Sequence, residues 1–119
     1  DPALLTLKGL VFDALLNHSK ALACYDQIIK NNSRSEYTFY YKANSLASLG
    51  DSDDALKQYE KAISINPNFY QAHYNAGCVL MSKNDLHAAI ERFKKVITLD
   101  PLVQSLLQYK FSSTKKSSI

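Results

Sequence analysis

The chain repeats itself with a period of 34 residues, and this repetition limits the folds that are open to it. The segment "YYKANSLASLGDSDDALKQYEKAISINP" aligns with "YNAGCVLMSKNDLHAAIERFKKVITLDP", so that Tyr40 falls on Tyr74 and Ala55 falls on Ala89. A shift of one period towards the N-terminus gives "TLKGLVFDALLNHSKALACYDQIIKNNS", where the match is weaker and Ser33 replaces the closing proline. Three similar units of this length indicate an array in which each unit packs on its neighbours.

Each unit is predicted to be a pair of helices joined by a tight turn. In the second unit Ala55, Tyr59 and Ala62 recur at helical spacing. Gly50 interrupts the chain before this helix, and Pro67 ends it because the residue before a proline is pushed out of the helical region. The third unit repeats both signals, with "ND" at the turn and "DP" at the end. The predicted fold class is therefore all-α.

The pattern resembles the tetratricopeptide repeat, in which W-x₂-L-G-x₂-Y is followed by A-x₃-F and then by P. The resemblance covers about residues 2–103 as three units, which span residues 2–35, 36–69 and 70–103. The matching positions are the small residue (Gly9, Ala43, Gly77), the first alanine (Ala21, Ala55, Ala89), the aromatic (Tyr25, Tyr59, Phe93) and the tryptophan position (Phe39, His73). The resemblance implies a right-handed superhelical solenoid of antiparallel helix pairs, with the first helix of each pair lining a concave groove.

The sequence also departs from this pattern at a few positions. Lys8 and Lys42 stand where leucine is usual, and Ile28 and Val96 stand where a second alanine is usual. A small residue at the matching positions is expected to let the two helices of a pair approach closely. The aromatic residue is expected to fill the gap between one pair and the next.

A seventh helix is predicted over residues 102–111, where Leu102, Leu106 and Leu107 give an apolar stripe. Each repeat leaves an apolar face open, so we expect this helix to cap the last one. A single domain would then span residues 1–111. The polar stretch "SSTKKSSI" predicts a flexible tail over residues 112–119.

The predicted binding surface is one arc of the first helix in each unit. The spacing i, i+3/i+4, i+7 brings tyrosines and an asparagine of the second unit onto this arc. Tyrosine offers a large contact area at low entropic cost, and asparagine offers both a donor and an acceptor to a peptide backbone. The predicted partner-binding residues are Tyr37, Tyr40, Tyr41, Asn44, Gln71, Tyr74, Asn75, Cys78 and Tyr109.

Two interpretations of these rings stay open. Tyrosine is common in the family at the position of Tyr40 and Tyr74, so these rings can serve packing instead of binding. Tyr37 and Tyr41 are expected to be exposed in the groove, whereas Phe39 is expected in the core. The predicted function is a non-catalytic scaffold or adaptor module that holds a peptide or helix of a partner protein.

Some family members bind the acidic C-terminal tail of Hsp70 or Hsp90 through a clamp of lysine, arginine and asparagine. Aligned from the second unit, Asn44 and Asn75 match this clamp, but Tyr40, Ser105 and Tyr109 stand at its other positions. Aligned from the first unit, no residue type matches. Without a cation little would hold two carboxylates, so the clamp is not expected here.

Two other functions remain as alternatives. Asn75 also resembles the asparagine ladder in the repeat region of O-linked N-acetylglucosamine transferase, so the chain could be a regulatory or substrate-selecting region of a larger enzyme such as a glycosyltransferase. The start at "DPALL", without Met, fits a segment cut from a longer protein. The other alternative is a self-assembly module, which makes a homo-oligomer a possible state.

Catalysis, metals and cofactors are not expected within the chain. His18, His73 and His87 are far apart in the repeat frame, and His18 and His87 are expected in solvent. The net charge of +3 comes without a basic run, which argues against nucleic acid, and no apolar stretch approaches the ~20 residues of a membrane span. Cys24 and Cys78 fit no metal or redox spacing and are expected to be free thiols in a reducing, cytoplasmic compartment.

Overall fold

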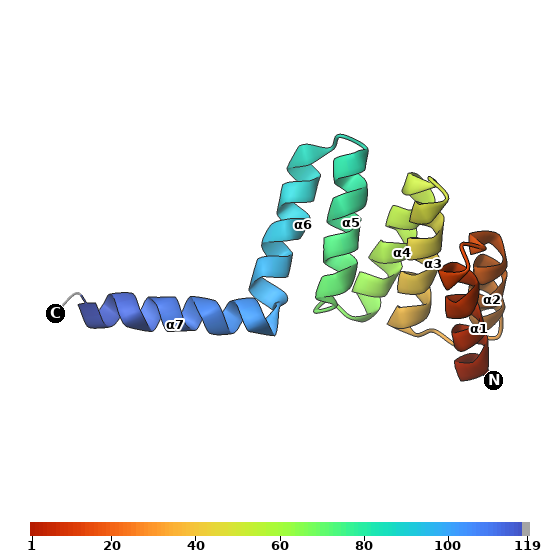
Figure 1. Ribbon diagram of the computed structural model, residues 1–119, viewed down its shortest axis with the longest axis horizontal. Coiled ribbons are helices and arrows are strands. Elements are labelled where there is room, and N and C mark those ends of the chain that lie inside the picture. Colours follow the sequence, from red (N-terminus) through yellow and green to blue (C-terminus); the bar gives the residue numbers. More distant parts are fainter. Residues whose placement is uncertain (118–119) are drawn as a thin grey trace.

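The computed structural model describes the backbone of residues 1–117 and the side chains of residues 1–110. Its helices are α1 (Pro2–Ala14), α2 (His18–Lys30), α3 (Glu36–Ser48), α4 (Ser52–Ile65), α5 (Tyr70–Ser82), α6 (Leu86–Leu99) and α7 (Pro101–Ser117). These seven helices, with no strand among residues 1–117, confirm the all-α, right-handed superhelical solenoid (Figure 1). None of them combines the length and the apolar character that a membrane crossing needs.

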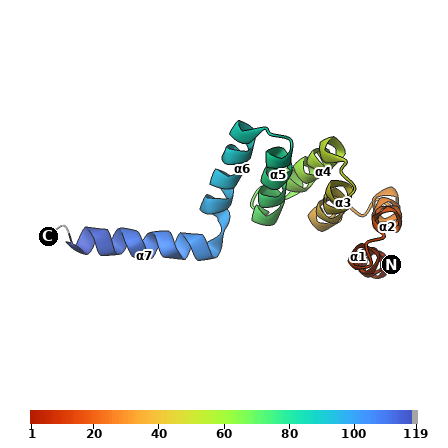
Figure 2. The ribbon, with the colours of Figure 1, turned by 45° about the horizontal axis from the view of Figure 1, so that its top comes forward.

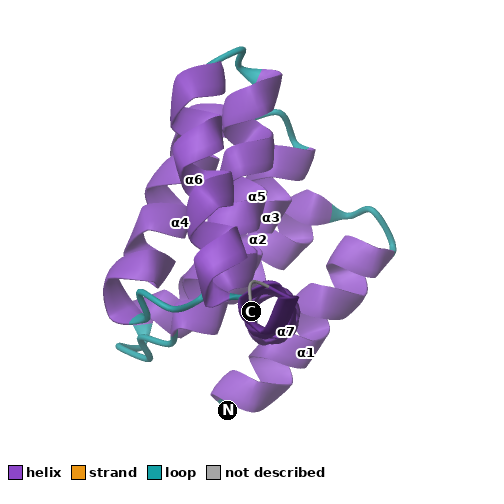
Figure 3. Ribbon diagram, turned by 90° about the vertical axis from the view of Figure 1, so that its left-hand side faces the viewer, coloured by secondary structure: helices purple, strands orange, loops and turns teal. Residues whose placement is uncertain are grey.

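The helices form three antiparallel pairs, α1–α2, α3–α4 and α5–α6, which stack in chain order (Figures 1 and 2). The second helix of one pair contacts the first helix of the next pair: α2 contacts α3, and α4 contacts α5. The first helices also contact each other, α1 with α3 and α3 with α5. Seen along the array, the pairs overlap one another while α1 stands apart from α4 and α6 (Figure 3). The first helices therefore share one side of the solenoid.

The turn inside each pair has the same backbone conformation in all three repeats. Leu16, Gly50 and Asn84 occupy this position with φ angles of 62°, 82° and 63°. Glycine and asparagine visit this left-handed region readily, whereas leucine in it costs roughly 1–2 kcal/mol. The packing of α1 on α2 therefore imposes a turn that the local sequence of the first repeat does not favour.

The small residues of the first helices sit beneath the aromatic rings of the second helices. A Cβ atom on Gly9 would lie 2.5 Å from Tyr25 Cε1, and one on Gly77 would lie 2.7 Å from Phe93 Cε1. Real Cβ atoms do not approach other atoms this closely. The predicted close approach of the two helices in a pair is therefore confirmed at both positions.

The core is continuous through the second repeat and into the third. Phe39, Tyr59 and Phe69 are buried in one cluster with the alanines of α3, α4 and α5, which confirms the predicted core position of Phe39. A smaller cluster in the first repeat holds Tyr25, with Tyr41 packed against it from the next repeat. At a position where the family pattern has leucine, Lys42 instead pairs with Asp26 of α2, at 2.7 Å between Nζ and Oδ1.

The seventh helix is present, but it does not cap the solenoid as predicted. It points away from α6 (Figure 1), and Leu102 and Leu106 are 70% and 62% exposed. The reason lies in the connection, because Asp100 alone separates α6 from α7, whereas residues 66–69 separate α4 from α5. One residue is too short a link for the chain to reverse and lay α7 along α6.

The helix also ends later than expected, at Ser117 instead of residue 111. The flexible tail predicted from residue 112 stays a prediction, and its residues 118–119 lie outside the described part of the chain.

Candidate functional site

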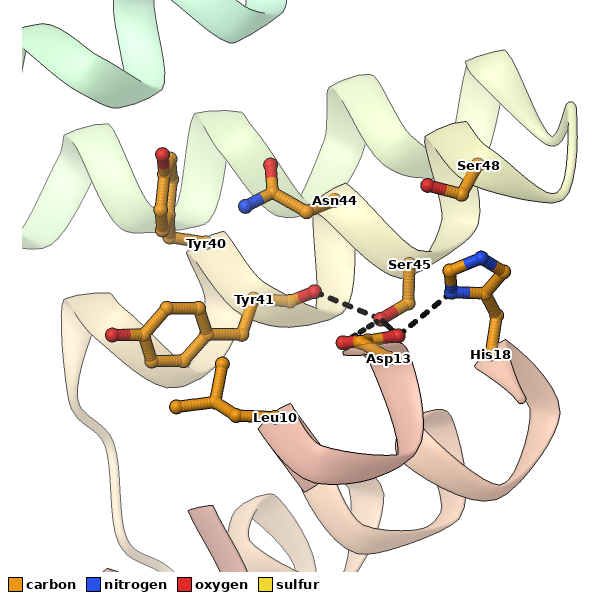
Figure 4. A pocket seen from close by; sticks show the side chains of 8 residues that line it. All are labelled: Leu10, Asp13, His18, Tyr40, Tyr41, Asn44, Ser45 and Ser48. Carbon is orange, nitrogen blue, oxygen red and sulfur yellow. Dashed lines mark hydrogen bonds and ion pairs between the residues drawn. The ribbon is translucent and has the colours of Figure 1, made fainter. Parts of the chain in front are cut away.

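A groove runs between α1 and α3 and consists of two adjoining pockets. The Asp13 pocket has a volume of about 320 Å³ and is lined by Leu10, Asp13, His18, Tyr40, Tyr41, Asn44, Ser45 and Ser48 (Figure 4). The Tyr37 pocket has a volume of about 420 Å³ and is lined by Pro2, Ala3, Thr6, Ser33, Ser35, Tyr37, Thr38 and Tyr41. Tyr41 lines both pockets, so the two are halves of one surface, which we call the α1–α3 groove.

The tyrosines of α3 divide between the groove and the core. Tyr37 is 53% exposed and its ring lies 5.2 Å from that of Phe69, between centroids. Tyr40 is half-buried, 4.8 Å from Phe69 by the same measure. Tyr41 is half-buried as well, with its ring 6.0 Å from Tyr25 and 6.5 Å from Tyr37. All three tyrosines thus reach the groove while resting on buried aromatic rings.

The two predicted asparagines are joined to each other and to two tyrosines. Asn75 Nδ2 donates to Asn44 Oδ1 at 2.9 Å and to the Tyr40 hydroxyl at 3.1 Å. The Tyr59 hydroxyl also donates to Asn44 Oδ1. Among the described residues, Asn44 Nδ2 and Asn75 Oδ1 are left without a hydrogen-bond partner. Part of each amide is therefore committed to tying α3, α4 and α5 together, and part is available to a ligand.

The other predicted residues do not gather in this groove. Gln71, Tyr74 and Cys78 lie exposed on α5, where the Tyr74 ring packs 5.8 Å from Phe93. Tyr109 is 76% exposed on α7. Because α7 leaves the solenoid at Asp100, Tyr109 is carried away from the face that we expected it to share (Figure 1).

Asp13 lines the Asp13 pocket, where we did not predict a functional residue (Figure 4). Its carboxylate accepts hydrogen bonds of 2.8 Å from the Tyr25 hydroxyl, from Ser45 Oγ and from His18 Nδ1. His18, which we expected in solvent, is thus half-buried against this carboxylate. The sequence contained a signal for this position. Asp13 is the only charged residue on the arcs of α1, α3 and α5 that correspond to the predicted binding surface.

The hydroxyl groups around the groove are held as neutral donors. Burial, followed by the hydrogen bond to Asp13, raises the pKa of Tyr25 well above its ordinary value. Burial and the neighbouring Tyr40 likewise raise the pKa of Tyr59. The residues that line the groove include one carboxylate, one histidine and no lysine or arginine. Among the described residues, no three or more histidine, cysteine, aspartate or glutamate side chains lie close enough together to hold a metal ion.

Comparison with known families gives two matches, both to the same kind of repeat. Residues 37–69 match the tetratricopeptide repeat family, and residues 58–91 match a second description of the same repeat. No curated protein sequence matches the chain.

Several solved structures resemble the chain in fold. The TPR2B domain of yeast Sti1, in complex with an Hsp70 peptide, has a TM-score of 0.81 at 22% identity, over 87% of this chain and 83% of that one. The second TPR of Spaghetti (RPAP3), bound to the HSP90 peptide SRMEEVD, has a TM-score of 0.79 at 18% identity, over 83% and 92%. MamA has a TM-score of 0.80 at 20% identity, over 85% of this chain and only 59% of MamA. At these identities the likeness shows the fold alone.

Proposed function

This chain is a tetratricopeptide repeat protein, and from that premise we propose that it holds a peptide or helix of a partner protein in the α1–α3 groove. In this proposal it is a non-catalytic scaffold or adaptor in the cytoplasm. The observation that carries the proposal is the groove itself, where exposed Tyr37 lines one half and the partly unsatisfied Asn44 lines the other. The free thiols of Cys24 and Cys78 are compatible with a reducing compartment.

The neighbours lend support at the level of the fold. The Sti1 and Spaghetti domains were solved with Hsp70 and HSP90 peptides, so this architecture can accept a peptide. Among the described residues, no lysine or arginine lines the groove, although an acidic peptide such as SRMEEVD would need one. We therefore propose the same mode of binding for a different class of peptide.

The test is selection of binders from a displayed library of short random peptides, followed by affinity measurement for each enriched peptide by fluorescence anisotropy. Tyr37→Ala removes an exposed ring from the groove and should weaken binding about tenfold or more. Tyr109→Ala removes an exposed ring from α7 and should leave the affinity unchanged. Circular dichroism of both variants reports whether the fold is retained.

The proposal fails if no peptide is enriched, or if the enriched peptides bind the Tyr37→Ala variant as tightly as the unmodified chain. A loss of affinity in Tyr109→Ala with none in Tyr37→Ala would instead place the binding surface on α7.

A second candidate function is self-assembly, which the open end of the solenoid favours. Leu86, Ile90 and Ile97 leave an apolar stripe exposed on α6, and α7 exposes further leucines. Light scattering over a range of concentrations tests this candidate. A dimer that persists in Tyr37→Ala and dissociates in Ile90→Glu would support it, whereas a monomer at every concentration would exclude it.

A further inference from the structure

We propose that the Asp13 pocket receives a lysine or arginine side chain of the bound partner segment. This inference rests on the proposed function, since it names the class of peptide that the α1–α3 groove would take. It adds a preference for a cation that comes from the charge, the walls and the size of one half of the groove.

The charge of the pocket comes from Asp13. Its side chain is 21% exposed, and among residues 1–110 it is the only acidic side chain that lines either half of the groove. Tyr25, Ser45 and His18 supply three donors to a carboxylate that has about four acceptor positions. Hydrogen bonds from hydroxyl groups orient the carboxylate and leave its negative charge in place. The Asp13 carboxylate is therefore held still at the edge of an open cavity.

None of the side chains that line the cavity supplies a lysine or arginine to balance this charge. The nearest basic group is His18, whose Nδ1 lies against Asp13 Oδ1 in the pocket wall, at 2.8 Å (Figure 4). A partly buried carboxylate attracts a cation more strongly than an exposed one, because less water screens it. The occupant favoured by charge complementarity is thus a cationic side chain of another molecule.

The walls suit the rest of a long basic side chain. Tyr40 and Tyr41 present aromatic rings, and Leu10 presents an apolar surface that is 37% exposed (Figure 4). Lysine and arginine bury their methylene stems against apolar surface while the charged end stays at a polar site. A tyrosine face adds a favourable interaction with the cation itself. At about 320 Å³ the pocket is at the small end for a ligand site, which suits one side chain.

The asparagine next to this pocket can fix the backbone that carries the basic side chain. Asn44 lines the pocket, and its Nδ2 group has no partner among the described residues, so it can donate to a peptide carbonyl. The predicted mode is therefore a cation in the Asp13 pocket, a backbone contact at Asn44, and apolar contacts of the same segment on Tyr37.

The experiment uses peptides enriched from the random library on the intact chain. We expect a lysine or arginine at one fixed position of the enriched peptides. Replacing it with norleucine keeps the stem, removes the charge, and should weaken binding about tenfold. Replacing it with glutamate should remove detectable binding.

Two variants of the protein test the location. Ser48 is exposed and lines the pocket, so Ser48→Lys places a competing ammonium group there without removing a hydrogen bond of Asp13. It should weaken the binding of basic peptides about tenfold. Ser105→Lys adds the same charge at an exposed position of α7 outside both pockets and should leave the affinity unchanged. Asp13→Asn should have the same effect as Ser48→Lys, with circular dichroism as the check on its fold.

The outcomes separate this inference from the function on which it rests. Peptides that lose affinity in Tyr37→Ala, but tolerate norleucine and bind Ser48→Lys normally, would overturn the cation site and leave the peptide groove intact. Peptides whose affinity is also unchanged in Tyr37→Ala would overturn both the cation site and the peptide groove. Enrichment of acidic peptides would contradict the cation site directly.

Discussion

The second and third repeats carry equivalent residues, but only the second has a closed core. Tyr59 in α4 is 1% exposed, while Phe93, one period later in α6, is half-buried. Leu56 and Ile63 of α4 are half-buried, whereas their counterparts Ile90 and Ile97 of α6 are 51% and 49% exposed. Equivalent sequence therefore gives different burial in two places of the same chain.

The difference lies in the helix that comes after each repeat. The helix α5 packs on α4 and contributes Ala72, Ala76 and Val79 to its core, whereas α7 leaves α6 without covering it (Figure 1). Three of the ten buried residues of this core belong to the next repeat, as expected for an array in which each unit packs on its neighbours. The repeat pattern thus specifies a surface, and the neighbouring element decides whether this surface is buried.

The largest effect is expected from removing the aromatic residue at the closed position. Tyr59→Ala should lower the free energy of unfolding by about 3–5 kcal/mol, because it leaves a cavity between three helices and removes a hydrogen bond to Asn44. Phe93→Ala should cost roughly half as much, since solvent already reaches that ring. Urea unfolding of both variants measures the difference, and equal losses would show that α6 is covered in solution.

The two close-packed glycines give the next largest difference. Gly9→Ala should destabilise the chain by about 1–3 kcal/mol, because Tyr25 is fully buried and its hydroxyl is bound to Asp13, so the ring cannot move away. Gly77→Ala should stay within about 1 kcal/mol of the unmodified chain, because Phe93 can shift toward solvent and alanine favours the helix. Thermal unfolding measures both, and a larger loss for Gly77→Ala would reverse the comparison.

A pH effect is expected from His73, which occupies in the third repeat the place of Phe39 in the second. Burial, with further contributions from Arg92 and Lys95, lowers the pKa of His73, whose Nε2–H donates to the Pro67 carbonyl at 3.0 Å. In the unfolded chain His73 therefore takes up a proton near pH 6.5, whereas in the folded chain it stays neutral until a lower pH. Stability should fall as the pH drops below about 6.5, down to the lower pKa of the folded state.

The variant His73→Phe removes this titrating group and reproduces the residue of the second repeat. Its stability should depend less on pH between about 6.5 and the acidic end of the transition, as measured by urea unfolding at a series of pH values. An unchanged pH dependence would assign the effect to other groups.

The smallest effect is expected on α7. Replacing Leu102 and Leu106 together by glutamine should change the free energy of unfolding by less than about 0.5 kcal/mol, because both side chains are exposed. A loss of more than about 2 kcal/mol would show that α7 folds back on α6 as the cap that its sequence suggested.

Much of the fold could be predicted because its signals are local or strictly periodic. The small residue at Gly77, the aromatic at Phe93 and the stop at Asp100–Pro101 lie within one repeat and belong to one pattern. Part of the groove was predictable in the same way, since the spacing of Tyr37, Tyr41 and Asn44 places them on one arc. The position of α7 was not, because an apolar stripe tells which side must be buried and not which element is near enough to bury it.

The sequence by itself determined the number of helix pairs and the arc of α3 on which tyrosine and asparagine lie. These properties depend on residues at most one period apart, where the chain geometry leaves little choice. Only the tertiary structure decided that Tyr25 of α2 and Ser45 of α3 both donate to Asp13 of α1, and that Tyr109 lies away from the groove. Contacts between three helices depend on how the pairs pack and on how long their connections are. A periodic sequence pattern predicts neither the packing of the pairs nor the effect of a connection's length.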